Sequence, residues 1–200
     1  MLIIGVTGGI GSGKSVVCKI FERLGIAVYN ADTEAKNLMN TDTALIKEIK
    51  KQFGANMYSA KEGLNRKKMA EVIFKNKEQL EKLNNLVHPF VKKHFQKWKK
   101  ENMNSKYLVK EAAILFESGA DEDCDRIVTV VAPNDLRIKR VMERDEVTKE
   151  RVEAIMKNQM SSTEKIKRSD FVVTNDNQYL VIPQVLELHE SFLKQYKDYR

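Results

Sequence analysis

The chain alternates short apolar runs with longer segments in which apolar residues recur every three or four positions. The short runs are rich in branched side chains, as is typical of buried strands, and they cover residues 2–7, 26–30, 106–111, 127–132 and 171–174. The longer segments have the spacing of amphipathic helices. Strands that alternate with helices predict an α/β fold, with a five-stranded parallel sheet flanked by helices. Right-handed crossovers then place the first strand at the centre of this sheet.

The pattern changes between the second and third strands. Over residues 34–106 strand character disappears and only helical periodicity remains. We therefore expect a core made of residues 1–33 and 107–200, interrupted by a helical insertion of residues 34–106. Pro89 falls within the last helical pattern of the insertion, so this helix is expected to kink or to restart there.

The loop after the first strand carries the clearest chemical signal, because it fits G-x-x-x-x-G-K-[ST] between a strand and a helix. Its glycines let successive N–H groups point at one anion, and the following helix adds its positive end. The pattern predicts a P-loop that binds a nucleoside triphosphate, in which Lys14 reaches the phosphates and the Ser15 hydroxyl is a ligand of Mg²⁺. The residues expected to bind the nucleotide here are Gly8, Gly9, Gly11, Ser12, Gly13, Lys14, Ser15 and Val16.

Composition narrows the class of partner. The 200 residues carry a formal net charge of +7, which suggests a polyanionic partner, either nucleic acid or a phosphate-rich small molecule. Lysines and arginines are spread along the predicted helices without an arginine-rich arm, so we expect no nucleic-acid partner. The two cysteines are far apart and lack metal or redox spacing, which indicates a reduced, cytoplasmic protein. The chain opens directly with a strand, and no apolar run approaches the roughly 18 residues of a membrane span, so neither a signal peptide nor a membrane partner is expected.

Other P-loop classes fit poorly. A GTPase needs a guanine-reading Asn-Lys-x-Asp, and the nearest match, residues 175–178, lacks the lysine and the final acid. No strand ends in the apolar run followed by Asp that motor ATPases and helicases use. A later helix instead carries Arg140 and Arg144 four residues apart, on one face. These features favour a small-molecule phosphotransferase with an arginine-bearing lid.

Asp32 follows the second strand, at the edge where α/β sheets bind ligands. The alternative is a structural role, as the N-cap of a helix that begins at Thr33.

Taken together, these motifs resemble those of the dephospho-CoA kinase family over nearly the whole chain. The resemblance is carried by residues 7–15, 30–32, 64–66, 86–89, 114–117 and 139–145, and by Gln159 and Asn175. A P-loop alone is common to many kinases, whereas this ordered set is much more specific. The resemblance implies transfer of the ATP γ-phosphoryl group to the ribose 3′-hydroxyl of dephospho-CoA, the last step of coenzyme A biosynthesis. It also implies that the insertion is the CoA-binding domain and that a lid covers about residues 134–165.

The resemblance also implies roles for residues outside the P-loop. Asp32 would accept the proton of the attacking hydroxyl or orient it, and Arg140 would neutralise charge on the moving phosphoryl group. Arg144 would assist at the nucleotide, with an ion pair to Asp145 as the alternative. Asn175 would contact adenine.

Three further residues are expected at the substrate. Arg66 and His88 would contact dephospho-CoA, although a lone histidine at a helix junction is usually structural. Glu111 would support the Mg²⁺ shell through water or contact the substrate ribose.

Three positions depart from the family pattern. Val16 stands where threonine is common, Ala113 replaces a proline that could shift the loop after the third strand, and Asn30 replaces a frequent aspartate. Asp32 is therefore the only carboxylate at the end of the second strand.

Two other functions remain open from the residues alone. A nucleoside or nucleoside-monophosphate kinase would transfer phosphate preferentially to a free nucleotide. A nucleic-acid-binding P-loop protein would phosphorylate no acceptor and would lose affinity steeply with salt. The expected assembly is a monomer or a weak homo-oligomer.

Overall fold

The computed structural model describes residues 1–59, 63–74 and 76–198. It divides into two compact units, which we call the core unit (residues 1–30 and 99–200) and the insertion unit (residues 31–98). The insertion begins earlier than expected because the second strand passes directly into a helix at Ala31. It also ends earlier, because the last turn of its final helix belongs to the core unit.

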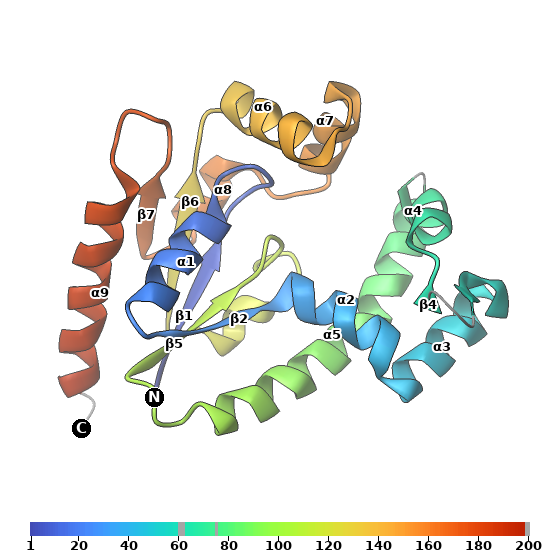
Figure 1. The fold of residues 1–200 in the computed structure, drawn as a ribbon, viewed down its shortest axis with the longest axis horizontal. Helices are drawn as coiled ribbons and strands as arrows, with labels where there is room; N and C mark the ends of the chain where they lie inside the picture. The colour runs from blue at the N-terminus through green and yellow to red at the C-terminus, as the bar shows by residue number, and fades with distance from the viewer. Residues whose placement is uncertain (60–62, 75, 199–200) are drawn as a thin grey trace. The chain divides into compact units, whose positions relative to one another are not determined.

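The core unit contains a parallel sheet with the strand order β2-β5-β1-β6-β7, which confirms the predicted central position of the first strand. Its strands are β1 (Leu2–Thr7), β2 (Ala27–Asn30), β5 (Tyr107–Glu111), β6 (Arg126–Val131) and β7 (Phe171–Thr174). Val6 of β1 lies opposite Glu111 of β5 and Val128 of β6, so these strands end at the same edge. The loops that follow β1 and β5 therefore leave the sheet side by side (Figure 1).

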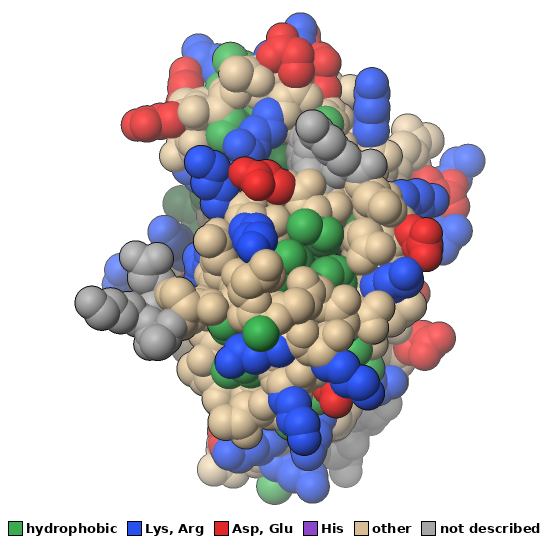
Figure 2. Space-filling model, turned by 90° about the vertical axis from the view of Figure 1, so that its right-hand side faces the viewer, with side chains coloured by type: hydrophobic (Ala, Val, Ile, Leu, Met, Phe, Trp, Pro, Cys, Tyr) green, Lys and Arg blue, Asp and Glu red, His purple; other side chains and the backbone are tan. Residues whose placement is uncertain are grey.

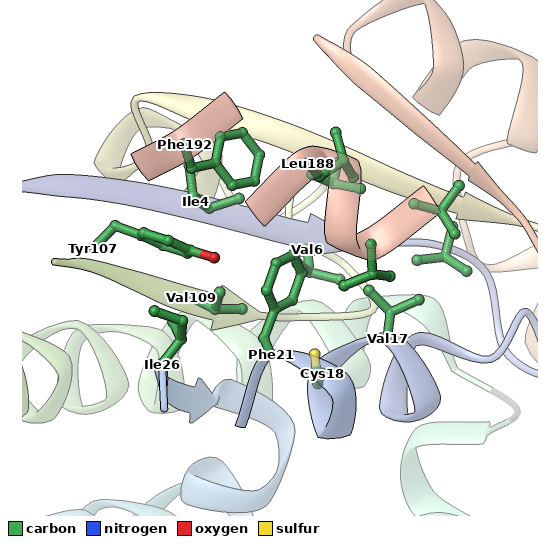
Figure 3. Packing of buried hydrophobic residues seen from close by; sticks show 14 of the residues in the cluster. Ile4, Val6, Val17, Cys18, Phe21, Ile26, Tyr107, Val109, Leu188 and Phe192 are labelled. Carbon is green, nitrogen blue, oxygen red and sulfur yellow. The ribbon is translucent and has the colours of Figure 1, made fainter. Parts of the chain in front are cut away.

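One face of the sheet is covered by α1 (Lys14–Arg23) and α9 (Val181–Asp198), which also pack against each other. Ile4 and Val6 point into this layer and are fully buried, together with Phe21 of α1 and Phe192 of α9 (Figure 3). The Phe192 ring packs edge-on against Tyr107 and Phe171, at 5.5 Å between ring centroids in both pairs. Each buried aromatic contributes about 1.5–3 kcal/mol relative to an exposed one, so this layer fixes α1 firmly under the P-loop.

The opposite face is covered by the residues that follow β5. A side chain at Gly5 of β1 would lie 2.8 Å from Leu115 and 3.0 Å from the Cys124 sulfur, so these two residues sit directly on the strand. Lys165 of α8 (Ser162–Lys167) is fully buried beside them, with its ammonium 2.9 Å from the Glu117 carboxylate. Removing one partner of such a buried pair costs about 3–5 kcal/mol, so the pair anchors α8 to this loop.

The expected lid segment consists of α6 (Asn134–Asp145), α7 (Lys149–Lys157) and α8. Helix α8 is capped by Ser161, whose hydroxyl accepts the Glu164 N–H at 3.2 Å. Thr148 occupies the N-cap position of α7, but its side chain makes no capping hydrogen bond to the backbone.

The insertion unit packs four helices around its own apolar core. These are α2 (Ala31–Thr41), α3 (Thr43–Phe53), α4 (Arg66–Phe74) and most of α5 (Lys77–Glu101). The prediction that strands are absent here is wrong, because β3 (Tyr58–Ser59) and β4 (Gly63–Leu64) form an antiparallel pair. Asn40 of α2 holds this pair by accepting the Leu64 N–H at 2.9 Å. Strands of two residues are too short to produce an alternating pattern in the sequence.

The prediction for Pro89 left two alternatives, a kink or a restart, and the restart does not occur. Helix α5 continues through Pro89, and Figure 1 shows that its direction changes along its length, which agrees with a kink. A proline removes one N–H and crowds one carbonyl, which a long helix tolerates by bending when its apolar side is well packed. Leu83, Val87 and Phe95 provide that packing on both sides of the proline.

Lysines and arginines are dispersed over the surface with acidic side chains between them, as the face in Figure 2 shows. Several form exposed pairs one helical turn apart, such as Lys82 with Glu78 at 2.9 Å. In the part of the chain that the structure describes, every helix is too short or too polar to cross a membrane.

Candidate active site

The P-loop curls between β1 and α1 and is stabilised by its own backbone. The Ser12 N–H donates to the Gly9 carbonyl at 3.1 Å, and the Val16 N–H donates to the Gly13 carbonyl at 2.9 Å. Gly11 and Gly13 have φ values of 77° and 96°, in the left-handed region that glycine adopts without strain. Gly8 also has a positive φ, of 151°, so the loop needs glycine for its conformation at three positions.

The same loop also needs glycine because neighbouring groups press against it. A Cβ at Gly8 would overlap the Val130 carbonyl, and a Cβ at Gly9 would overlap the Arg137 guanidinium. At Gly13 it would overlap the Asn175 side-chain amide. The β6 end, α6 and the β7 end thus surround the loop closely.

Lys14 and Ser12 offer groups suited to a phosphate. The Lys14 ammonium donates to the Gly8 carbonyl at 2.9 Å, which holds it across the loop. The buried Ser12 hydroxyl has no hydrogen-bond partner among the described residues. Buried polar groups are nearly always paired, so this hydroxyl fits a ligand oxygen bound inside the loop. Ser15 is exposed in the first turn of α1, where a metal ion could reach its hydroxyl.

Glu111 brings a carboxylate to the edge of the same loop. It is the last residue of β5, is 4% exposed, and lies 3.9 Å from the Lys14 ammonium. The Asn30 side chain donates a short hydrogen bond to its other oxygen. Asn30 therefore fixes Glu111 without adding a second negative charge. Among the described residues, no three His, Cys, Asp or Glu side chains gather as a metal site.

Arg140 of α6 is bound to the loop after β7. Its guanidinium donates to the Asn175 carbonyl at 3.0 Å, and to the side-chain oxygens of Asn177 at 2.8 Å and Asn175 at 3.3 Å. The Asn175 amide in turn donates to the Ser12 carbonyl at 2.9 Å. Asn175 therefore joins the P-loop to the lid segment.

Arg144 has different surroundings from Arg140, although the two share a helix. It is exposed and forms the alternative ion pair with its neighbour Asp145, at 2.7 Å from Nε to Oδ1. The hydrogen bond that Arg144 donates to this carboxylate raises the pKa of Arg144. The structure thus brings Arg140, and not Arg144, to Asn175.

Three predicted residues belong to the insertion unit. Asp32 lies within the first turn of α2, so its alternative role as an N-cap is wrong. His88 is half-buried in α5, where desolvation lowers its pKa and the negative charge of Asp32 acts in the opposite direction. Asp32 and His88 are therefore close enough to interact. Arg66 is the first residue of α4 and is exposed.

The sequence did not single out Arg137. It is 5% exposed, and its Nε donates to the Ile10 carbonyl of the P-loop at 2.9 Å. The Ile10 N–H donates to Gln159, also at 2.9 Å. Arg137 reads as one more charged residue on a polar helix, so no signal in the sequence reveals its burial.

A P-loop on the central strand, an adjacent lysine and a lid segment that carries arginines define a P-loop kinase. The family model described as dephospho-CoA kinase matches residues 2–180. The chain belongs to the dephospho-CoA kinase family, which catalyses the final step of coenzyme A biosynthesis.

Relatives and solved structures agree with this assignment. A dephospho-CoA kinase of Fusobacterium nucleatum is 40% identical over 177 residues, which cover 88% of this chain and 91% of that protein. The structure of a Campylobacter jejuni dephospho-CoA kinase superposes with a TM-score of 0.70 at 26% identity, covering 96% of this chain and 98% of that one. A Thermus thermophilus crystal structure superposes with a TM-score of 0.81 at 28% identity and covers 97% of both chains.

The contact between Gly13 and Asn175 yields a test with a matched control. Gly13→Ala should weaken binding of a non-hydrolysable ATP analogue by about tenfold or more, because the new methyl group displaces Asn175 as well as straining the backbone. Gly25→Ala has comparable strain, at φ 79°, but open space around its Cβ, so its affinity should stay normal. Isothermal titration of both variants decides the matter, and equal affinities would contradict a close P-loop contact.

Proposed function

We propose that this chain transfers the γ-phosphoryl group of ATP to the ribose 3′-hydroxyl of dephospho-CoA, producing CoA and ADP. The observation that carries the proposal is the P-loop, with an unpaired buried Ser12 hydroxyl and the ammonium of Lys14 beside it. Membership of the family supplies the acceptor, because the family model extends through the insertion unit.

The donor half of the reaction belongs to the core unit. Backbone N–H groups of the P-loop and Lys14 hold the triphosphate, and Ser15 would hold Mg²⁺. Mg²⁺, when bound, would neutralise negative charge on the phosphates. Glu111 would support the water shell of the metal or contact the substrate ribose, and Asn175 contacts adenine from the loop after β7.

Charge on the moving phosphoryl group is neutralised by Arg140, with Arg144 assisting at the nucleotide. Arg140 has to exchange its bonds to Asn175 and Asn177 for bonds to phosphate. The exchange is feasible because the bonds involve uncharged amide oxygens, which hold a guanidinium less strongly than a carboxylate does.

The acceptor half belongs to the insertion unit. Arg66 and His88 bind dephospho-CoA, whose diphosphate suits the fork of a guanidinium. The 3′-oxygen attacks the γ-phosphorus while the bond to the β–γ bridging oxygen breaks and ADP leaves. Asp32 accepts the proton that the hydroxyl releases.

An acceptor panel tests the activity itself. The purified protein with ATP and Mg²⁺ should release ADP in a coupled assay when dephospho-CoA is added, and mass spectrometry should detect CoA. Lys14→Ala should abolish this release, because the variant lacks the cation between the phosphates. Faster transfer to a nucleoside or a nucleoside monophosphate would overturn the assignment of the acceptor.

The role of Asp32 is tested by Asp32→Asn, with Asp42→Asn as the matched control. Asp42 caps α3 through the N–H groups of Ala44 and Leu45, a role that asparagine can also fill. Asp32→Asn should lower kcat by about 10² or more while ATP binding stays normal, because the proton acceptor is lost. Steady-state rates and ATP-analogue affinities separate these quantities. Near-normal turnover in Asp32→Asn would exclude it as the base.

Arg66 is tested by Arg66→Ala, with its exposed neighbour Lys67 changed to alanine as the control. Loss of charge-assisted hydrogen bonds to the substrate should raise KM for dephospho-CoA by about tenfold and leave KM for ATP unchanged. A similar small change in both variants would show that Arg66 acts only through the general surface charge.

A further inference from the structure

The crest of the P-loop, which we define as Gly9, Ile10 and Gly11, is held by side chains of the lid segment. The Ile10 N–H donates to the Gln159 side-chain oxygen, and the Ile10 carbonyl accepts from Arg137 Nε, both at 2.9 Å. Both backbone polar groups of one P-loop residue are therefore bound from outside the loop. Rotation of this peptide segment requires the loss of two hydrogen bonds.

Arg137 is itself firmly fixed. Its Nη1 donates to Asn134 Oδ1 at 3.1 Å and to Ser162 Oγ at 3.3 Å, which joins the start of α6 to the start of α8. Its Nη2 lies so close to Gly9 that a Cβ there would overlap it. The Arg137 backbone carbonyl also lies close to Gly11, 2.5 Å from where a Cβ would be. The crest therefore packs directly against Arg137.

The surroundings of this guanidinium are unusual for a buried cation. Its hydrogen-bond acceptors are a carbonyl, an amide oxygen and a hydroxyl, and no carboxylate of the described residues lies within ion-pair distance. Desolvation lowers the pKa of Arg137, although arginine keeps its charge in proteins. A buried charge without a counterion is costly unless an anion is nearby. A loop built to bind phosphates provides that anion.

We propose that Arg137 is a positioning residue for the nucleotide: it fixes the P-loop crest and lends its uncompensated charge to phosphate binding without touching the transferred group. Gln159 contributes to the first of these effects only, since it is neutral. The inference rests on the proposed function only in taking ATP as the ligand of the loop, and it does not depend on the acceptor.

The test compares Arg137→Gln, Arg137→Lys and Gln159→Ala with the control Lys139→Gln. Lys139 is an exposed residue of the same helix, so its replacement removes an equal charge away from the loop. The ligands are ADP and a non-hydrolysable ATP analogue, and their affinities are measured by isothermal titration with the full-length protein. Thermal unfolding without ligand reports folding.

Arg137→Gln should weaken binding of the ATP analogue by about tenfold or more and binding of ADP by a smaller factor, because Coulomb energy grows with the charge of the ligand. Gln159→Ala should weaken the binding of both ligands by the same factor. Arg137→Lys keeps the positive charge, so the ratio of its affinities for the ATP analogue and ADP should stay near that of the wild type. Lys139→Gln should change neither affinity. KM for dephospho-CoA should stay normal in all four variants.

Equal weakening of ADP and the ATP analogue in Arg137→Gln would overturn the charge contribution, and unchanged affinities in a folded variant would overturn the proposal altogether. If Arg137→Gln fails to fold, the comparison between Arg137→Lys and Gln159→Ala decides. A ratio of the affinities for the ATP analogue and ADP that falls well below the wild-type ratio in Arg137→Lys would contradict the proposal. Normal nucleotide binding without transfer to dephospho-CoA would sink the proposed acceptor but leave this inference intact.

Discussion

Close packing around the P-loop backbone is the constraint on which the rest of the core unit depends. Three elements touch the loop where side chains are missing: the end of β6 at Gly8, α6 at Gly9 and Gly11, and the end of β7 at Gly13. A single methyl group at any of these positions would displace its neighbour. The glycines therefore serve the loop conformation and also set how near the lid segment and the β7 end can approach.

The second face of the sheet depends on buried charges as well as apolar packing. Lys165 pairs with Glu117, and Lys110 pairs with Asp123, with 2.9 Å between the charged atoms in each pair. Glu117 also accepts the Met160 N–H at 2.7 Å, so one carboxylate binds two parts of the lid segment. Such pairs add little net stability over apolar packing, but they specify one arrangement because a misplaced partner leaves a buried charge. They explain how the loop after β5 and the lid segment keep their alignment.

The sequence was sufficient to predict the features that depend on a local pattern of residues. The buried strands and the central position of the P-loop strand follow from the pattern of apolar residues along the chain, and both are confirmed. Features that depend on tertiary contacts were missed or misjudged. The β3–β4 pair exists because Asn40 accepts a hydrogen bond from Leu64, and nothing in either segment alone indicates it.

The candidate site shows the same division. The P-loop was predictable because one segment contains the whole motif. Which side chains pack against the loop was not predictable, because they come from distant parts of the chain. Arg140 and Arg144 have the same chemistry and lie one helical turn apart. Arg140 contacts Asn175, which follows β7 much later in the chain, whereas Arg144 pairs with its neighbour Asp145. Arg137 looks like a surface residue until α6 is placed on Gly9 and Gly11. Spacing identifies which residues share a helix face but not what that face contacts.

Charge compensation separates the cations of the core unit into two groups. Lys165 and Lys110 each form an ion pair with a carboxylate, and these pairs stabilise the structure. Arg137 and Arg140 are bound by neutral oxygens within the described structure. A cation held by neutral groups keeps most of its field for another anion, whereas a matched pair largely cancels its own. Both arginines lie on α6, where Arg137 binds Ile10 of the P-loop and Arg140 binds Asn175, so two uncompensated positive charges stand next to the loop where a polyphosphate would bind.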